Sequence, residues 1–66
     1  MTDTAPRDNE GFDIIINGEN RLLADLELSA VMTAGFHKDN YPADKVQIGN
    51  RANETLRTVL GYARLE

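Results

Sequence analysis

The strongest periodic pattern in this sequence lies in residues 51–65. At 100° per residue, the apolar side chains of this segment fall within an arc of roughly 100°, the width of the stripe that a helix turns towards a core. These side chains are Ala52, Leu56, Val59, Leu60 and Ala63. The pattern predicts an amphipathic helix, and such a helix needs an apolar partner elsewhere in the chain.

The length of the chain restricts where that partner is found. Its 66 residues make a single domain, and a chain of this size buries only about 60% of its unfolded surface. Disulfides, a bound metal or self-association usually stabilise such small domains. The chain has no cysteine and a single histidine, His37, which argues against disulfides, thiolate metal sites and histidine-rich metal sites. We therefore expect a homodimer that uses no metal and no cofactor.

Charge and hydropathy narrow the class of protein further. The formal net charge is −4 and the pI is about 4.8, which argues against a general affinity for nucleic acids. No apolar run has the length of a membrane span, and the first residues lack the features of a secretory signal. The absence of cysteine fits a cytoplasmic protein. Residues 1–10 are polar and predict a disordered tail, and residues 11–66 predict a single small domain.

The first structured element is predicted to be a strand in residues 11–17. Three consecutive isoleucines favour a strand because β-branched side chains are stiff in a helix. Phe12, Ile14 and Ile16 then share one face. Asn17 and Gly18 follow, and both tolerate the positive φ angles of a tight turn.

Residues 20–34 have two interpretations. In a β-hairpin, residues 20–28 form a second strand that returns along the first one. In a helix, Leu22, Leu23 and Leu26 begin an apolar arc that continues to Ala34. Leucine, alanine and glutamate dominate the segment, so propensity favours the helix, with Gly35 as its terminating residue.

The helical interpretation leaves a second apolar arc, formed by Ala24, Leu28, Val31 and Met32. A helix that is apolar on two sides is normally buried on two sides. One side faces the helix at 51–65, and we expect the other to face a second subunit.

Residues 36–50 are expected to connect the two helices. The segment from Phe36 to Tyr41 is read as a loop whose aromatic residues can anchor a protein contact. The alternative, favoured for Phe36, is that its ring closes the end of the small core. Pro42 suits the first turn of a helical segment. A break follows at Gly49, after which Asn50 caps the helix at 51–65.

We find no set of residues that indicates catalysis. His37 lies near one acidic residue, Asp39, but near no serine or cysteine nucleophile, so we expect a solvated loop histidine. The glycines match no phosphate-binding motif. Gly61 is placed within the predicted helix, where it allows another backbone to approach closely. Arg57 and Arg64 lie on one flank of that helix and can contact phosphate or an acidic partner. We therefore predict no catalytic, cofactor-binding or metal-binding residues.

The predicted fold is mainly α, a short N-terminal strand followed by a two-helix hairpin, with an α+β fold containing an N-terminal β-hairpin as the alternative. The function predicted from it is that of a small non-enzymatic protein-binding factor, such as an inhibitor, adaptor or phage-like accessory protein, acting as a homodimer. The expected partner or dimer interface comprises Leu28, Val31, Met32, Phe36, Tyr41, Arg57 and Arg64.

An alternative function comes from the order strand, helix, helix over residues 11–66. This order resembles that of ribbon-helix-helix regulators, in which strands from two copies pair and read the major groove of DNA. The resemblance is one of topology. It implies Asp13, Ile15 and Asn17 as the reading positions, and none of them is basic.

Overall fold

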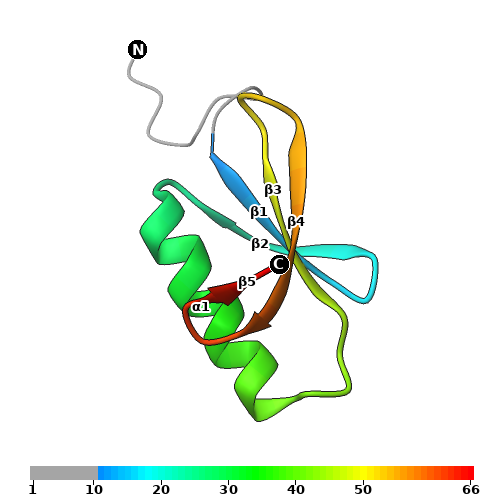
Figure 1. Ribbon diagram of the computed structural model, residues 1–66. Coiled ribbons are helices and arrows are strands. Elements are labelled where there is room, and N and C mark those ends of the chain that lie inside the picture. Colours follow the sequence, from blue (N-terminus) through cyan, green and yellow to red (C-terminus); the bar gives the residue numbers. More distant parts are fainter. Residues whose placement is uncertain (1–10) are drawn as a thin grey trace.

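A computed structural model describes residues 11–66, which form a five-stranded antiparallel sheet with one helix packed on one face (Figure 1). The elements in chain order are β1 (Phe12–Ile16), β2 (Glu19–Ala24), α1 (Glu27–Asn40), β3 (Val46–Asn50), β4 (Thr55–Gly61) and β5 (Arg64–Leu65). The strands lie in the order β2-β1-β3-β4-β5. The fold is therefore α+β, and the predicted mainly α fold with a helical hairpin is wrong. The disordered tail predicted for residues 1–10 lies outside the described residues.

The segment predicted to be the C-terminal helix is β4 and β5. Thr55, Thr58 and Val59 are β-branched and suit a strand. Asn50 does use its side chain as expected of a cap, because its Oδ1 accepts a hydrogen bond from the Ala52 N–H at 2.9 Å. The bond begins a turn rather than a helix, an alternative open to asparagine wherever its side chain bonds the nearby backbone.

The hairpin that was the second interpretation of residues 12–28 is present as β1 and β2. Asn17 (φ 53°) and Gly18 (φ 86°) form its two-residue turn. Positive φ at both positions matches the right-handed twist of the strands, which explains why Asn-Gly is favoured there. The predicted strand at residues 11–17 is confirmed, whereas the predicted helix at residues 20–34 is wrong in its first half.

Helix α1 starts later and ends later than predicted. It begins after Leu26 and continues to Asn40, so Gly35 lies inside it and Phe36 lies in its last two turns. The interpretation of residues 36–41 as a loop is therefore wrong, except for Tyr41 at the C-cap. Residues 42–45 connect α1 to β3, so no helix begins at Pro42.

The core lies between α1 and the sheet. Alternate residues of three neighbouring strands point towards the helix and are buried there with two helical alanines. These residues are Ile14, Ile16, Val46, Ile48, Val59, Ala30 and Ala34. Burying each isoleucine or valine contributes about 1.5–3 kcal/mol, so this small cluster provides the main apolar stabilisation of the described residues.

Helix α1 lies close to the sheet because its inner side carries small residues. Ala30, Ala34 and Gly35 are buried there. A Cβ at Gly35 would lie 2.6 Å from Tyr62 Cα and 2.9 Å from the Gly61 carbonyl oxygen. A close backbone approach was expected at Gly61, but the atoms nearest to a Cβ there belong to the side chains of Asp39 and Arg64, and the glycine that allows a backbone to approach is Gly35. The small inner residues leave the large side chains of α1 pointing outwards.

The sheet has an open face. Within residues 11–66, the only helix covers the side of the sheet that carries the core (Figure 1). No helix of these residues has the length and apolar character needed to cross a membrane.

Candidate protein-interaction surfaces

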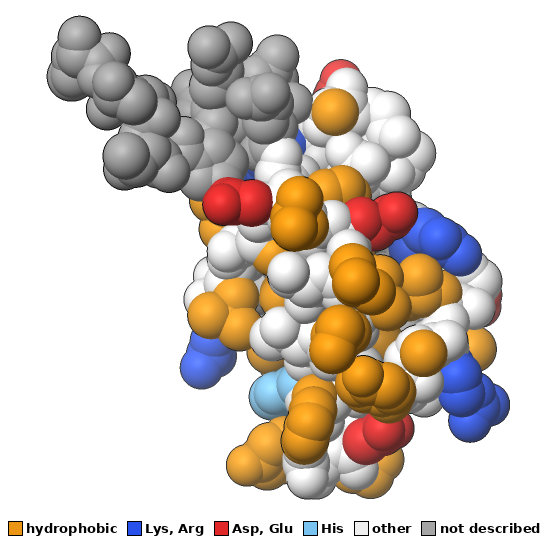
Figure 2. All heavy atoms as spheres, turned by 90° about the vertical axis from the view of Figure 1, so that its left-hand side faces the viewer, with side chains coloured by type: hydrophobic (Ala, Val, Ile, Leu, Met, Phe, Trp, Pro, Cys, Tyr) orange, Lys and Arg blue, Asp and Glu red, His pale blue; other side chains and the backbone are white. Residues whose placement is uncertain are grey.

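An exposed row of large apolar side chains runs along the outer side of α1. Leu28, Met32 and Phe36 are spaced four residues apart and are 67%, 43% and 63% exposed. At 1.5 Å per residue, the row is about 12 Å long. Figure 2 shows it as part of a band of hydrophobic side chains on the helix side of the molecule.

Tyr62 extends this row onto the turn between β4 and β5. Its ring meets that of Phe36 edge to face, with ring centroids 6.3 Å apart. Such edge-to-face pairs are favourable because the positive ring edge faces the negative ring face. We refer to Leu28, Met32, Phe36 and Tyr62 as the helix stripe.

The remaining residues of the predicted interface are spread around the stripe. Val31 is half-buried and packs against the core, so it offers little to a partner. Tyr41 lies at the end of α1, with its ring 4.9 Å from that of His37. Arg57 on β4 donates to the carbonyl oxygen of Glu66 at 3.3 Å. Arg64 on β5 lies near Gly61, its Cδ being 3.8 Å from the position of a Cβ there.

A second apolar surface lies on the open face of the sheet. A Cβ at Gly49 would lie 3.6 Å from Ile15 Cδ1 and 3.7 Å from Leu56 Cδ1, so both side chains flank this glycine. Leu23, which pairs with Asp13, lies on the same face and is 43% exposed. Ile15, Leu23 and Leu56 define the open sheet face.

The open sheet face was not predicted from the sequence. Leu23 and Leu56 were assigned to helical arcs that pack together, whereas both are strand residues with exposed side chains. The alternation of Leu56 with Thr55 and Arg57 is the strand signal that was available.

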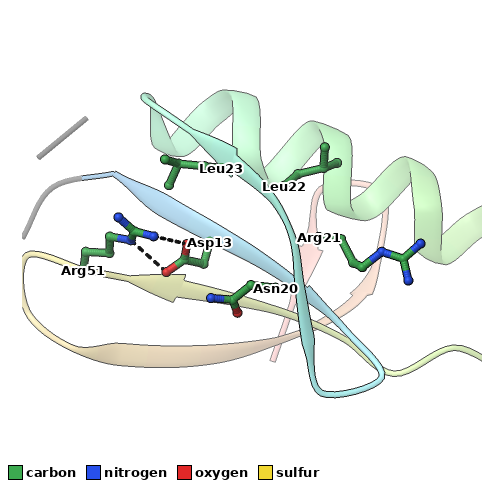
Figure 3. A pocket seen from close by; sticks show the side chains of 6 residues that line it. All are labelled: Asp13, Asn20, Arg21, Leu22, Leu23 and Arg51. Carbon is green, nitrogen blue, oxygen red and sulfur yellow. Dashed lines mark hydrogen bonds and ion pairs between the residues drawn. The ribbon is translucent and has the colours of Figure 1, made fainter. Parts of the chain in front are cut away.

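A shallow pocket of about 230 Å³ lies beside β2 (Figure 3). Its lining residues are Asp13, Asn20, Arg21, Leu22, Leu23 and Arg51. A register shift between β1 and β2 leaves Arg21 without a pairing partner on β1, and such a bulge bends a strand and increases its twist.

The two most polar lining residues of the pocket, Arg51 and Asp13, are bonded to each other. Arg51 Nε and Nη2 donate to the two carboxylate oxygens of Asp13 at 3.0 and 2.9 Å. This paired geometry fixes the orientation of both groups. The Arg51 guanidinium is therefore committed to the fold, and we do not assign an anion site to the pocket.

A polar cluster lies at the C-terminal end of α1. His37 Nε2 is 2.8 Å from Asp44 Oδ2, and the Asn17 side-chain amide donates to Asp44 Oδ1 at 3.2 Å. These hydrogen bonds, that of His37 above all, lower the pKa of Asp44 below its usual value of 3.8. Lys38 Nζ donates to the carbonyl oxygens of Pro42 and Asp44.

This cluster joins the β1–β2 turn, α1 and the loop before β3. The expected solvated histidine is therefore wrong, because His37 is only partly exposed and is held by Asp44. No serine or cysteine lies among these hydrogen-bonded residues, so the cluster has no nucleophile for the histidine to activate. Its evident role is to hold three segments together.

Neither metal chemistry nor similarity to known proteins adds a further site. In the part of the chain that the structure describes, no three histidine or acidic side chains gather in a way that would hold a metal ion. No protein-family model matches the sequence, and comparisons with curated proteins and with solved structures also find no significant match. The two apolar surfaces are therefore the main candidates for function.

Proposed function

We propose that this protein is a small non-enzymatic protein-binding factor that self-associates through its helix stripe. The observation that carries the proposal is the exposure of Leu28, Met32 and Phe36 in one row on α1. Scattered exposed leucines are normal, but contiguous apolar surface is typical of protein contact sites. Aromatic residues and methionine are also the side chains enriched in such sites.

The open sheet face provides a surface for a different protein. It lies on the opposite side of the sheet from α1, so a second copy on the helix stripe leaves it accessible. Ile15 and Leu56 are apolar, while the surrounding Asp13 and Gln47 are polar. An apolar centre with polar surroundings is the usual composition of a protein interface.

Self-association is tested by one pair of matched substitutions. Leu28→Asp places a charge in the helix stripe, and Ser29→Asp places the same charge on the next residue, which is also exposed. Sedimentation equilibrium should show a dimer for the wild type and for Ser29→Asp, and a monomer for Leu28→Asp. Circular dichroism should be the same for all three. A wild type that stays monomeric at every concentration overturns the proposed self-association.

Binding of another protein is tested on the open sheet face. Leu56→Asp should keep the fold, because Leu56 is 56% exposed. In a pull-down from the native host, a partner should be retained by the wild type and by Ala52→Asp, a charge-matched control in the neighbouring turn. Equal recovery of the partner with Leu56→Asp would show that the open sheet face is not its binding site.

The fold removes the basis for the DNA-binding alternative. The resemblance to ribbon-helix-helix regulators required two helices after the strand, and residues 55–61 form β4 instead of the second helix. The net charge of −4 also disfavours contact with phosphates. A cytoplasmic location remains part of the proposal, supported by the absence of cysteine.

A further inference from the structure

Opposite charges lie at the two ends of the helix stripe. Asp25 and Glu27 lie at the end where α1 begins. Figure 2 shows acidic side chains at the upper end of the hydrophobic band and a further acidic side chain near its lower end. Arg64 lies near the other end, because its Cδ and the Oδ1 atom of Asp39, in the last turn of α1, are 3.8 and 3.0 Å from the position of a Cβ at Gly61. All three residues are exposed.

The other charged side chains at the Arg64 end, Lys38 and Asp39, bond to neutral groups of the same chain and have opposite signs, so Arg64 leaves this end with a net positive charge. Lys38 donates to two carbonyl oxygens, and Asp39 Oδ1 accepts the Tyr62 N–H at 3.3 Å. Within residues 11–66, the side chains of Asp25, Glu27 and Arg64 take part in no hydrogen bond or ion pair with one another or with other residues. Each of them is available to a partner.

This arrangement is self-complementary. In a twofold dimer, residue i of one copy contacts residue j of the other, and j contacts i. An antiparallel pair of stripes puts the acidic end of each copy beside Arg64 of the other. A parallel pair would instead bring four carboxylates together at one end, which is unfavourable.

We infer that a second copy of this chain binds the helix stripe in an antiparallel orientation, with a twofold axis near Met32 and with Asp25 and Glu27 of each copy facing Arg64 of the other. This inference rests on the proposed self-association and adds the geometry of the dimer. Antiparallel helices also place the positive end of one helix dipole beside the negative end of the other. Leu28 of one copy then packs against Phe36 of its partner.

Charge reversal tests the ionic part of the arrangement. Arg64→Glu should raise the dimer dissociation constant about 5–10-fold at low ionic strength, and reversing Asp25 and Glu27 to arginine should have a similar effect. The three reversals combined should restore the constant to within about twofold of the wild type. Lys45→Glu is the control, since it changes the net charge as Arg64→Glu does but lies in the loop before β3.

Engineered cysteines test the geometry directly, because the chain has none of its own. A disulfide requires Cα atoms closer than about 7 Å. Met32→Cys should cross-link rapidly with itself, and a mixture of Leu28→Cys and Phe36→Cys should form mixed dimers. Leu28→Cys alone should cross-link poorly, since the two copies of residue 28 lie at opposite ends of the stripe.

These experiments distinguish failure of the antiparallel geometry from failure of the proposed self-association. A wild type without a dimer overturns both. A dimer that Leu28→Asp dissociates, but in which the Leu28→Cys chains cross-link efficiently with each other, overturns only the antiparallel orientation. A dimer whose affinity changes as little with Arg64→Glu as with Lys45→Glu overturns the ionic contacts.

Discussion

Gly35 and Tyr62 are in backbone contact across the interface between α1 and the β4–β5 turn. A methyl group on Gly35 would lie 2.6 Å from the Cα of Tyr62, closer than real Cβ atoms come to such a neighbour. The contact explains why a glycine occupies the middle of the helix although it costs about 1 kcal/mol in helix propensity. Space, rather than backbone flexibility, selects glycine at this position.

Gly35→Ala should therefore destabilise the protein. Alanine gains helix propensity, but either the helix or the β4–β5 turn must move, and overpacking typically costs about 1–3 kcal/mol. Urea unfolding at a fixed protein concentration measures the difference. Thr33→Ala is the control, because Thr33 is exposed on the same helix and should become slightly more stable. A Gly35→Ala variant as stable as Thr33→Ala would contradict the close contact.

Two of the hairpin turns, the β1–β2 turn with Gly18 and the β4–β5 turn with Ala63, should respond in opposite ways to exchange of glycine and alanine. Ala63 has a φ of 57°, a conformation that costs an L-residue about 1–2 kcal/mol. Ala63→Gly should raise stability by about 0.5 kcal/mol, since greater freedom of the unfolded chain offsets part of the gain. Gly18→Ala should lower stability by about 1 kcal/mol, although no atom lies within 4 Å of the added methyl group. Thermal unfolding of both variants checks the opposite signs.

Stability should fall in acid through Asp44. Its folded-state pKa is below the usual 3.8, so its contribution is fully present above that pH and is lost as the pH falls through the lowered folded value. Asp44→Asn should flatten this part of the profile of unfolding free energy against pH. Glu54→Gln serves as the control, because Glu54 is exposed and lies in a turn outside this cluster. An unchanged acid limb in Asp44→Asn would contradict the assignment.

The Asp13–Arg51 pair should matter more than the pair of Glu19 and Arg21. Asp13 is the more buried, with 15% of its side chain exposed, and it accepts two hydrogen bonds from Arg51. Asp13→Asn should cost about 1.5–3 kcal/mol, the range for hydrogen bonds to charged groups. Glu19→Gln should change stability by less than about 1 kcal/mol, because both partners are more than half exposed. Equal losses in urea unfolding would contradict this ranking.

The parts of the fold that local chemistry determines were predictable. The isoleucines of β1 and the Asn17-Gly18 turn carry their own conformational preferences. Leu28 and Met32 were correctly placed in a helix, which the structure shows to be α1. Their role as a contact surface stays a prediction.

The errors in the predicted fold came from residues whose structural role depends on packing against distant parts of the chain. Leu56 and Leu60 both alternate with Val59 along β4, and Leu56 flanks Gly49 on the open sheet face. The alternation that Thr55, Leu56 and Arg57 begin is broken where Leu60 directly follows Val59, and the apolar residues of the segment then also fit the spacing of a helix. Gly35 was wrongly predicted to end the helix, because the sequence does not show that the backbone of Tyr62 packs against this glycine.

The central position of β1 in the sheet has a kinetic consequence. Ile14 pairs with Leu22 of the neighbouring strand β2 in the local hairpin. On its other side it pairs with Ile48 of β3, and the chain between these two residues includes all of α1. Closing that long loop costs chain entropy before any core contact offsets it. We therefore expect the β1–β2 and β3–β4 hairpins to form quickly and independently. The pairing of β1 with β3, which joins the two hairpins, should then limit the rate of folding.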